Sequence, residues 1–466
     1  MPNETQSADV IVVGAGLAGH SAALSAAETG ASVLFLEKTP RYGGSSITAG
    51  GSFAFSNTEA QRAAGIQDSD ELFRQDLFKA ANEKCDPVLV DAYLARQHEA
   101  HAWLQGMGVE FHKVSLSSST SVPRTHPTSP KQLLAALHER VQANKRIRWM
   151  PGTAARRLTV DDAGRVTGIE LADGKTRFMA KGGVILATGG FSRSPSYIEK
   201  FSPELATAPA WGGEGNTGDG MTMACALGAD FLDTGYVTGT YGISINHYPE
   251  LDSRPGDEPY LRMANYRGAI IVNLEARRFA DESISYKKLG LYTLMQAKAV
   301  AFQVFDQSIM DQSAVAPNIN DFKSVLELGM IRQANDWRSL GEAVGIDGNA
   351  LEATVMKYNV DVKAGTDTEY GRQTLGGGFG KPVPLEKPPF FIFPCTTAVL
   401  ATYCGLRVDA DGRVINVHDE LIEGLYAAGE NTGGFHGAGY VSGTALGKAA
   451  IFGRAAGRHA AALGRK

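Results

Sequence analysis

The sequence lacks the features that mark several large classes of protein. No apolar run reaches 18 residues in this 466-residue chain, so no membrane-spanning helix is expected, although peripheral association stays open. Basic runs are also absent and the formal net charge is −5, which argues against nucleic acid as a partner. The polar N-terminus has no signal-peptide pattern, so a cytoplasmic protein is expected.

Cysteine is scarce and its spacing is uninformative. Cys85, Cys225, Cys395 and Cys404 form neither a C-x-x-C pair nor a zinc-ligand pattern. We therefore expect free thiols in a reducing compartment and no metal site. A cysteine-rich segment for an iron–sulfur cluster or haem is missing as well, so electrons must leave to oxygen, a quinone or a partner protein.

A glycine-rich turn near the N-terminus is the strongest motif. The apolar run Val10–Val13 predicts a buried parallel strand. Gly14, Gly16 and Gly19 then follow with the G-x-G-x-x-G spacing at the start of a predicted helix, whose N-terminal N–H groups can hold a pyrophosphate. A second predicted strand ends at Glu37, an acid placed to accept hydrogen bonds from a ribose. This combination predicts a dinucleotide-binding unit.

Three later segments favour FAD over NAD. Residues 38–51 are rich in Gly, Ser and Thr and resemble the second flavin-contacting segment of FAD-dependent enzymes. The alternative is a flexible surface loop. Residues 183–190 end in Ala-Thr-Gly-Gly and residues 425–430 end in Ala-Gly-Glu; both resemble the closing segments of flavoproteins with two dinucleotide-binding domains. We expect non-covalent FAD, because no histidine for covalent attachment stands near Ser45.

The rest of the chain suggests an interrupted domain. Helical spacing of apolar residues predicts helices over 59–108, and a strand is predicted over 109–114. Tyrosines cluster after residue 233. We predict a first FAD-binding part over 1–233, an inserted capping domain over 234–375, and a second FAD-binding part over 376–466.

The whole chain resembles the fumarate reductase/succinate dehydrogenase flavoprotein superfamily, and within it the 3-ketosteroid dehydrogenase branch. The resemblance implies an α/β fold with two Rossmann-like dinucleotide-binding domains and an inserted α+β cap. The implied FAD contacts are Gly14, Gly16, Leu17, Ala18, Gly19, Glu37, Lys38, Gly43, Gly44, Ser45, Ser46, Gly50, Gly51, Ala154, Ala187, Thr188, Gly189, Asn216, Gly218, Asp219, Gly429, Glu430, Thr444, Ala445 and Leu446.

Two tyrosines carry the likeness to the ketosteroid branch. Tyr286 ends the pattern Arg-Phe-x-x-Glu-Ser-x-x-Tyr, in which that branch has its proton-abstracting base. Tyr440 stands where that branch has a tyrosine that hydrogen-bonds the ketone, helped by a glycine N–H; here Gly443 lies one residue earlier than the family's glycine. Fumarate reductases have an arginine at each tyrosine position, and a substrate histidine near residues 401–405 that this chain lacks. The alternative is that both tyrosines only pack.

The chemistry implied is the removal of hydrogen from carbons α and β to a ketone. A free tyrosine has a pKa of about 10 and is a poor base, so it needs a neighbouring donor or cation such as Lys287, Arg262 or another tyrosine. A small cyclic ketone, such as cyclohexanone or 4-oxocyclohexanecarboxylate, is the expected substrate. The candidate substrate contacts are Arg124, His126, Arg262, Arg267 and His436. Two alternatives stay open: a reductase of an unsaturated carboxylic acid, and a flavin-binding relay subunit.

Overall fold

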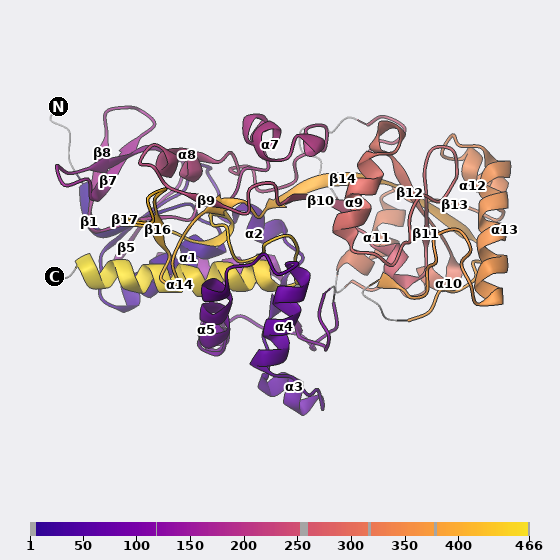
Figure 1. The fold of residues 1–466 in the computed structure, drawn as a ribbon, viewed down its shortest axis with the longest axis horizontal. Helices are drawn as coiled ribbons and strands as arrows, with labels where there is room; N and C mark the ends of the chain where they lie inside the picture. Colours follow the sequence, from indigo (N-terminus) through magenta and orange to yellow (C-terminus); the bar gives the residue numbers. More distant parts are fainter. Residues whose placement is uncertain (1–5, 118, 252–259, 316–317, 377–379, 465–466) are drawn as a thin grey trace. The chain divides into compact units, whose positions relative to one another are not determined.

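The computed structural model describes residues 6–117, 119–251, 260–315, 318–376 and 380–464, and the chain forms two compact units (Figure 1). The first unit contains Met1–Ala206, Gly212–Val237 and Ala401–Lys466, and the second contains Thr207–Trp211 and Thr238–Leu400. No helix in the described ranges is long and apolar enough to cross a membrane. The chain thus leaves the first unit, forms most of the second, and returns to the first.

The predicted return to the first unit at residue 376 is too early. The chain re-enters that unit only at Ala401, because the long strand β14 (Phe390–Thr402) is paired within the sheet of the second unit. The run of glycines near 376 falls mostly outside the described residues, and the described chain beyond it, from Gly380 to Leu400, still belongs to the second unit.

The first unit is built on an eight-stranded sheet. Its main path runs β16-β17-β8-β1-β2-β5, with β7 also on β8 and β6 on β7. Strands β1, β2, β5, β8 and β17 are parallel to one another, as a dinucleotide-binding fold requires. The bounds are β1 Gln6–Val13, β2 Val33–Leu36, β5 Ile147–Met150, β6 Ala155–Val160, β7 Val166–Leu171, β8 Arg177–Leu186, β16 Arg413–Ile415 and β17 Leu421–Ala427.

Helices and short strands surround this sheet. They are α1 Leu17–Glu28, α2 Gly44–Thr48, α3 Glu59–Ala63, α4 Asp70–Ala80, α5 Pro87–Gly106, α6 Pro130–Ala143, α7 Pro195–Phe201, α8 Asp219–Cys225, α14 Thr444–Gly464, β3 Ser52–Ala54, β4 Thr125–Pro127, β9 Phe231–Leu232 and β15 Gly405–Leu406. The first helix and the last run alongside each other (Figure 1). A Cβ at Gly453 would overlap the carbonyl oxygen of Ala18, so only glycine permits this close approach.

The second unit contains a five-stranded sheet of order β10-β14-β12-β11, with β13 also paired to β14. Its buried core is aromatic and aliphatic, and includes Phe302, Phe305 and Phe391. The bounds are β10 Val237–Ser244, β11 Ile270–Val272, α9 Tyr286–Leu294, β12 Ala301–Asp306, α10 Gln307–Met310, α11 Phe322–Glu327, β13 Arg332–Ala334, α12 Trp337–Glu342, α13 Gly348–Ala364 and β14 Phe390–Thr402.

One predicted element is wrong. Residues 109–114 form no strand, and their backbone makes only scattered hydrogen bonds, such as that from the His112 N–H to the Pro127 carbonyl oxygen at 2.8 Å. By contrast, α3, α4 and α5 confirm the helices predicted over 59–108.

Candidate functional site

The glycine turn after β1 packs tightly at Gly14 and less tightly at Gly16, at the start of α1. Gly14 adopts φ +103°, and a Cβ there would overlap the carbonyl oxygen of Ala187 on the neighbouring strand end. At Gly16 a Cβ would meet only Ser46 Oγ, at 3.4 Å, and Gly43 O, at 3.9 Å. The backbone therefore packs directly against Gly14 but leaves space beside Gly16. The N-terminal N–H groups of α1 at that point favour a phosphate.

Glu37 lies where β2 ends, beside this turn. Its Oε2 accepts a hydrogen bond from the Ala15 N–H at 2.9 Å, and its Oε1 accepts from the Thr39 N–H at 2.8 Å. An ionised carboxylate has about four acceptor sites, so Glu37 keeps capacity for a ribose hydroxyl. The Thr153 N–H donates to the Glu37 carbonyl oxygen at 2.8 Å, which brings Ala154 next to the same point.

Two serines join the glycine turn to a distant loop. The Leu17 N–H donates to Ser46 Oγ at 3.1 Å. Ser45 Oγ accepts from the Gly213 N–H at 2.9 Å and from Asn216 Nδ2 at 2.8 Å. Hydrogen bonds therefore link the start of α1, the segment at Ser45 and the loop at Asn216 into one side of the predicted FAD site.

The C-terminal segment contacts the same loop through Glu430. Asn216 Nδ2 donates to Glu430 Oε2 at 3.2 Å, and the Thr402 N–H donates to Glu430 Oε1 at 2.9 Å. Burial raises the pKa of the Glu430 carboxyl, although these hydrogen bonds oppose the rise. Lys38 Nζ pairs with Asp219 Oδ2 at 2.7 Å, which fastens the loop after β2 to the start of α8. All the predicted cofactor residues lie in the first unit.

Tyr440 lies in the loop before α14, in the first unit. Its oxygen accepts a hydrogen bond from the Gly443 N–H at 3.2 Å. Its ring stacks on Tyr403, with centroids 5.9 Å apart and an interplanar angle of 15°, and lies 5.4 Å from the His436 ring. Burial raises the pKa of Tyr440, so the phenol stays protonated at neutral pH.

Tyr286 is the first residue of α9, in the second unit. Ser285 caps this helix by accepting a hydrogen bond from the Lys287 N–H at 3.3 Å. The ammonium of Lys287 lies 5.2 Å from the centroid of the Tyr286 ring and donates to Thr240 Oγ1 at 2.7 Å. A cation therefore lies against the ring of Tyr286, and the residue stands at a helix N-terminus.

Comparison with known proteins decides the family. The model of the FAD binding domain family matches residues 9–446. The chain belongs to this family. FAD is therefore the cofactor of this flavoprotein, and the open turn at Gly16 with the acceptor Glu37 fits that group.

Sequence relatives place the flavoprotein with fumarate reductases. It is 33% identical to "Fumarate reductase (cytochrome)" of Shewanella frigidimarina, over all of this chain and 78% of the relative. It is 30% identical to "Urocanate reductase" of Eggerthella lenta, over 98% of this chain and 75% of the relative. The protein is thus an FAD-dependent oxidoreductase of the fumarate reductase family.

Solved structures confirm the predicted fold. The open conformation of a flavocytochrome c3 fumarate reductase superposes with a TM-score of 0.85 at 26% identity, covering 99% of this chain and 79% of that one. The 3-ketosteroid-Δ4-(5α)-dehydrogenase of Rhodococcus jostii RHA1, in complex with 4-androstene-3,17-dione, superposes with a TM-score of 0.73 at 27% identity, covering 98% and 97%. The flavoprotein fold with mixed α/β content is shared with both.

Arg124 and His126 do not fit the predicted substrate role. Arg124 is fully buried, and it pairs with Asp68 at 2.6 Å and Asp76 at 2.5 Å, so its charge is already compensated within the protein. His126 is also buried: its Nε2 lies 2.8 Å from Thr58 Oγ1 and its Nδ1 lies 2.8 Å from the Arg124 carbonyl oxygen. Burial lowers the pKa of His126 to about 4. Both side chains hold the β4 segment in place.

The two arginines of the second unit differ. Arg262 is buried and donates to the Asp321 carbonyl at 2.6 Å, the Leu261 carbonyl at 2.9 Å and the Ser324 hydroxyl at 3.1 Å. Arg267 is half-buried, and its Nε donates to no described residue. Within the described ranges Arg267 also forms no ion pair, so it is the better candidate for a substrate carboxylate.

Two further residues lie near these groups and belong to no sequence motif. Tyr403, whose ring stacks on that of Tyr440, is one of them. Lys448, in the second turn of α14, is buried and donates from Nζ to the Thr432 carbonyl oxygen at 2.5 Å. Lys448 could have been singled out from the sequence. It stands in a helical run of small and apolar residues, and a lysine is rarely buried in such a helix unless it has a partner.

Proposed function

We propose that this flavoenzyme is a dehydrogenase that introduces a C=C bond α,β to a ketone, with a small cyclic ketone such as an oxocyclohexanecarboxylate as substrate. The observation that carries the proposal is the hydrogen bond from the Gly443 N–H to the Tyr440 oxygen. The 3-ketosteroid-Δ4-(5α)-dehydrogenase that shares the fold is named for the same class of reaction, and it was solved with a ketone bound.

Tyr440 is proposed as the donor to the ketone oxygen. Because its oxygen already accepts from Gly443, its own hydrogen remains available for a substrate acceptor, and this polarisation strengthens it as a donor. Its raised pKa keeps that hydrogen in place. A preorganised donor at the carbonyl oxygen stabilises the charge that develops as the α-proton leaves.

Tyr286 is proposed as the base that takes the α-proton. Lys287 and the N-terminus of α9 stabilise the phenolate that this role requires. Bound FAD supplies the acceptor for the hydride from the β-carbon. The residues around Gly16, Glu37 and Glu430 hold that cofactor, and the electrons then pass to oxygen, a quinone or a partner protein.

A reductase of an unsaturated carboxylic acid is the second candidate. The names of the sequence relatives favour it, since they include fumarate and urocanate reductases. The tyrosines at positions 286 and 440 argue against it, because the resemblance puts arginines there in fumarate reductases. A flavin subunit that only relays electrons is the third, and turnover by the purified chain with an artificial acceptor would exclude it.

The test begins with substrate. FAD-loaded protein is mixed anaerobically with cyclohexanone, 4-oxocyclohexanecarboxylate, succinate and fumarate, and flavin absorbance is followed. Bleaching by the ketones is expected, and bleaching by succinate alone would contradict the proposal. Reoxidation of the reduced enzyme by fumarate would favour the reductase.

Two variants then separate the roles of the tyrosines. Tyr286→Phe is expected to lower kcat roughly 10²-fold and to abolish exchange of the substrate α-proton with deuterated solvent. Tyr440→Phe is expected to lower kcat roughly 10²–10³-fold and only to slow that exchange. Tyr292→Phe, an exposed position on the same helix as Tyr286, is the matched control and should behave as wild type. Near-normal turnover of Tyr286→Phe would mean that this tyrosine only packs.

A further inference from the structure

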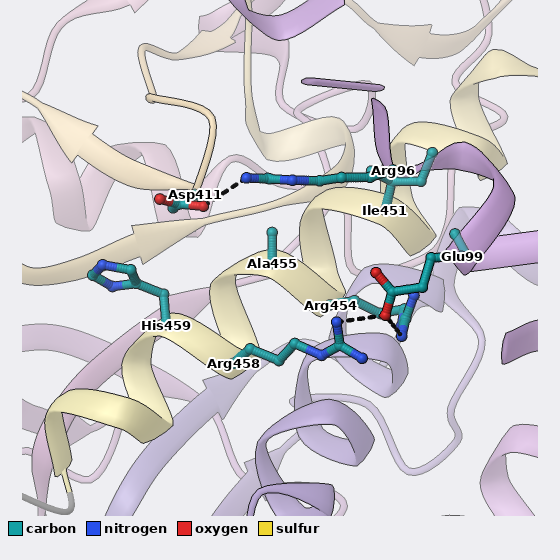
Figure 2. A pocket seen from close by; sticks show the side chains of 9 residues that line it. Arg96, Glu99, Asp411, Ile451, Arg454, Ala455, Arg458 and His459 are labelled. Atoms are coloured by element: carbon teal, nitrogen blue, oxygen red, sulfur yellow. Dashed lines mark hydrogen bonds and ion pairs between the residues drawn. The ribbon is translucent and has the colours of Figure 1, made fainter. Parts of the chain in front are cut away.

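A pocket lies on the first unit between helices α5 and α14 and the turn at Asp411. Its volume is about 330 Å³. Figure 2 shows the side chains that surround it: Arg96, Glu99, Ala100, Asp411, Ile451, Arg454, Ala455, Arg458 and His459. None of them is among the predicted contacts to FAD or substrate.

Positive charge predominates in the lining. Three arginines and a histidine face two carboxylates. Both Arg454 and Arg458 pair with the same oxygen of Glu99, at 2.9 and 2.6 Å, so one carboxylate serves two guanidinium groups (Figure 2). The third arginine, Arg96, pairs with Asp411 at 2.8 Å. The arginines therefore exceed the acids by one charge, and their N–H groups outnumber the carboxylate oxygens.

The arginines are held in place rather than loose. Arg454 is buried, and its guanidinium carbon lies 4.9 Å from the centre of the Trp103 ring. Burial and the neighbouring Arg458 lower the pKa of Arg454. Arg458 keeps 44% of its side-chain surface exposed, so its planar fork remains accessible to a ligand. An added negative charge would relieve the repulsion between these two groups.

Apolar side chains complete the pocket. Ala455 lines it beside the arginines and is partly exposed, whereas Ala100 and Ile451, which also line it, are almost fully buried, so an apolar ligand group would contact Ala455. An inorganic anion would make no use of this part of the pocket. An anion with a short hydrocarbon body would use both parts.

We propose that this pocket binds a small organic carboxylate, with the guanidinium of Arg458 binding the carboxylate and the hydrocarbon body lying against Ala455. Carboxylate and guanidinium match as two parallel hydrogen bonds, which is the geometry that arginine favours. The site is carried by α14, the helix whose first turn is predicted to contact FAD. It does not depend on the proposed ketone chemistry.

The experiment is isothermal titration of FAD-loaded protein with hexanoate, and separately with inorganic phosphate. We expect hexanoate to bind at one site, and Arg458→Ala to weaken that binding at least 10-fold. Arg458→Lys keeps the charge but lacks the fork, so a clear loss is expected there too. Arg140→Ala, an exposed arginine on α6, is the matched control and should change nothing.

A second variant tests the apolar part of the pocket without changing its charge. Ala455→Leu would fill the space beside Arg458 and should abolish hexanoate binding while the FAD content stays normal. Arg267→Ala should leave hexanoate binding unchanged, which separates this pocket from the proposed substrate carboxylate contact. Three outcomes would overturn the proposal: no binding heat, hexanoate binding that Arg458→Ala leaves intact, or phosphate binding as tight as that of hexanoate.

Discussion

Lys448 offers a direct test of the electrostatics inside the first unit. Its side chain is buried in α14, and its Nζ donates to the Thr432 carbonyl oxygen rather than to a carboxylate. Burial lowers its pKa from 10.5 to about 8, although Asp233 and Glu430 oppose this change. The perturbation is Lys448→Met, which keeps the length of the side chain and removes the charge.

The magnitude follows from proton linkage. A pKa lowered from 10.5 to about 8 corresponds to roughly 3 kcal/mol, because each factor of ten in protonation is worth about 1.4 kcal/mol. Between these two values the unfolded chain keeps a proton that the folded chain has lost. The stability of the wild type therefore rises with pH through this window, and the charge is destabilising below it. Between pH 7 and pH 9.5 the wild type should gain about 2 kcal/mol relative to Lys448→Met.

The assay is urea unfolding of the FAD-loaded proteins at several pH values. Unfolding is monitored by the increase in flavin fluorescence when FAD leaves the protein. At each pH the free energy of unfolding of the variant is subtracted from that of the wild type, so that the contributions of other titrating groups cancel. Lys145→Met, at an exposed position after α6, is the matched control and should show no such pH dependence. If this difference stays constant with pH, or falls as pH rises, the reasoning is refuted. The result would imply that Asp233 and Glu430 affect the pKa of Lys448 more than burial does.

Three further predictions concern the cofactor and the substrate. Acid precipitation should release FAD into the supernatant, whereas flavin retained by the denatured protein would show a covalent link. Arg267→Ala should raise KM for 4-oxocyclohexanecarboxylate at least 10-fold and leave KM for cyclohexanone unchanged, while Arg277→Ala, at an exposed position of the same unit, should affect neither; equal effects on both ketones would mean a structural role. Fumarate should be reduced at least 10²-fold more slowly than cyclohexenone by the reduced enzyme, and comparable rates would contradict the assignment of Tyr286 and Tyr440.

The fold was predictable where local pattern and tertiary role coincide. Val10–Val13 and the glycines after it identify β1 and the start of α1, because a buried parallel strand and a phosphate-binding turn each impose their own residue types. Residues 109–114 have an apolar pattern typical of a strand but find no partner strand. Pairing depends on the rest of the fold, and a short pattern does not encode it.

Sequence motifs placed the predicted cofactor residues better than the predicted substrate residues. Glu37 contacts the glycine turn through the Ala15 N–H, and Ser45 contacts Asn216, although each pair is far apart in the chain. Arg124 illustrates the limit: its carboxylate partner Asp68 is 56 residues away in the chain, so no local pattern could indicate that its charge is compensated within the protein. The local sequence around an arginine in a polar loop is the same whether the side chain binds substrate or stabilises the loop.

The proposed function rests on a difference of charge between this chain and fumarate reductases at two positions. The resemblance puts arginines in fumarate reductases where Tyr286 and Tyr440 stand here. An arginine is always cationic, and it compensates a substrate carboxylate that would otherwise be costly to bury. A phenol brings no charge. It suits a neutral ketone oxygen at position 440, where the Gly443 N–H and the raised pKa keep it a donor. At position 286 the proposal assigns the positive charge to the adjacent Lys287, whose ammonium lies 5.2 Å from the centre of the Tyr286 ring, as support for a phenolate and not as a substrate contact. The same cofactor cradle can thus serve a carboxylate or a ketone, according to whether positive charge faces the substrate or the base.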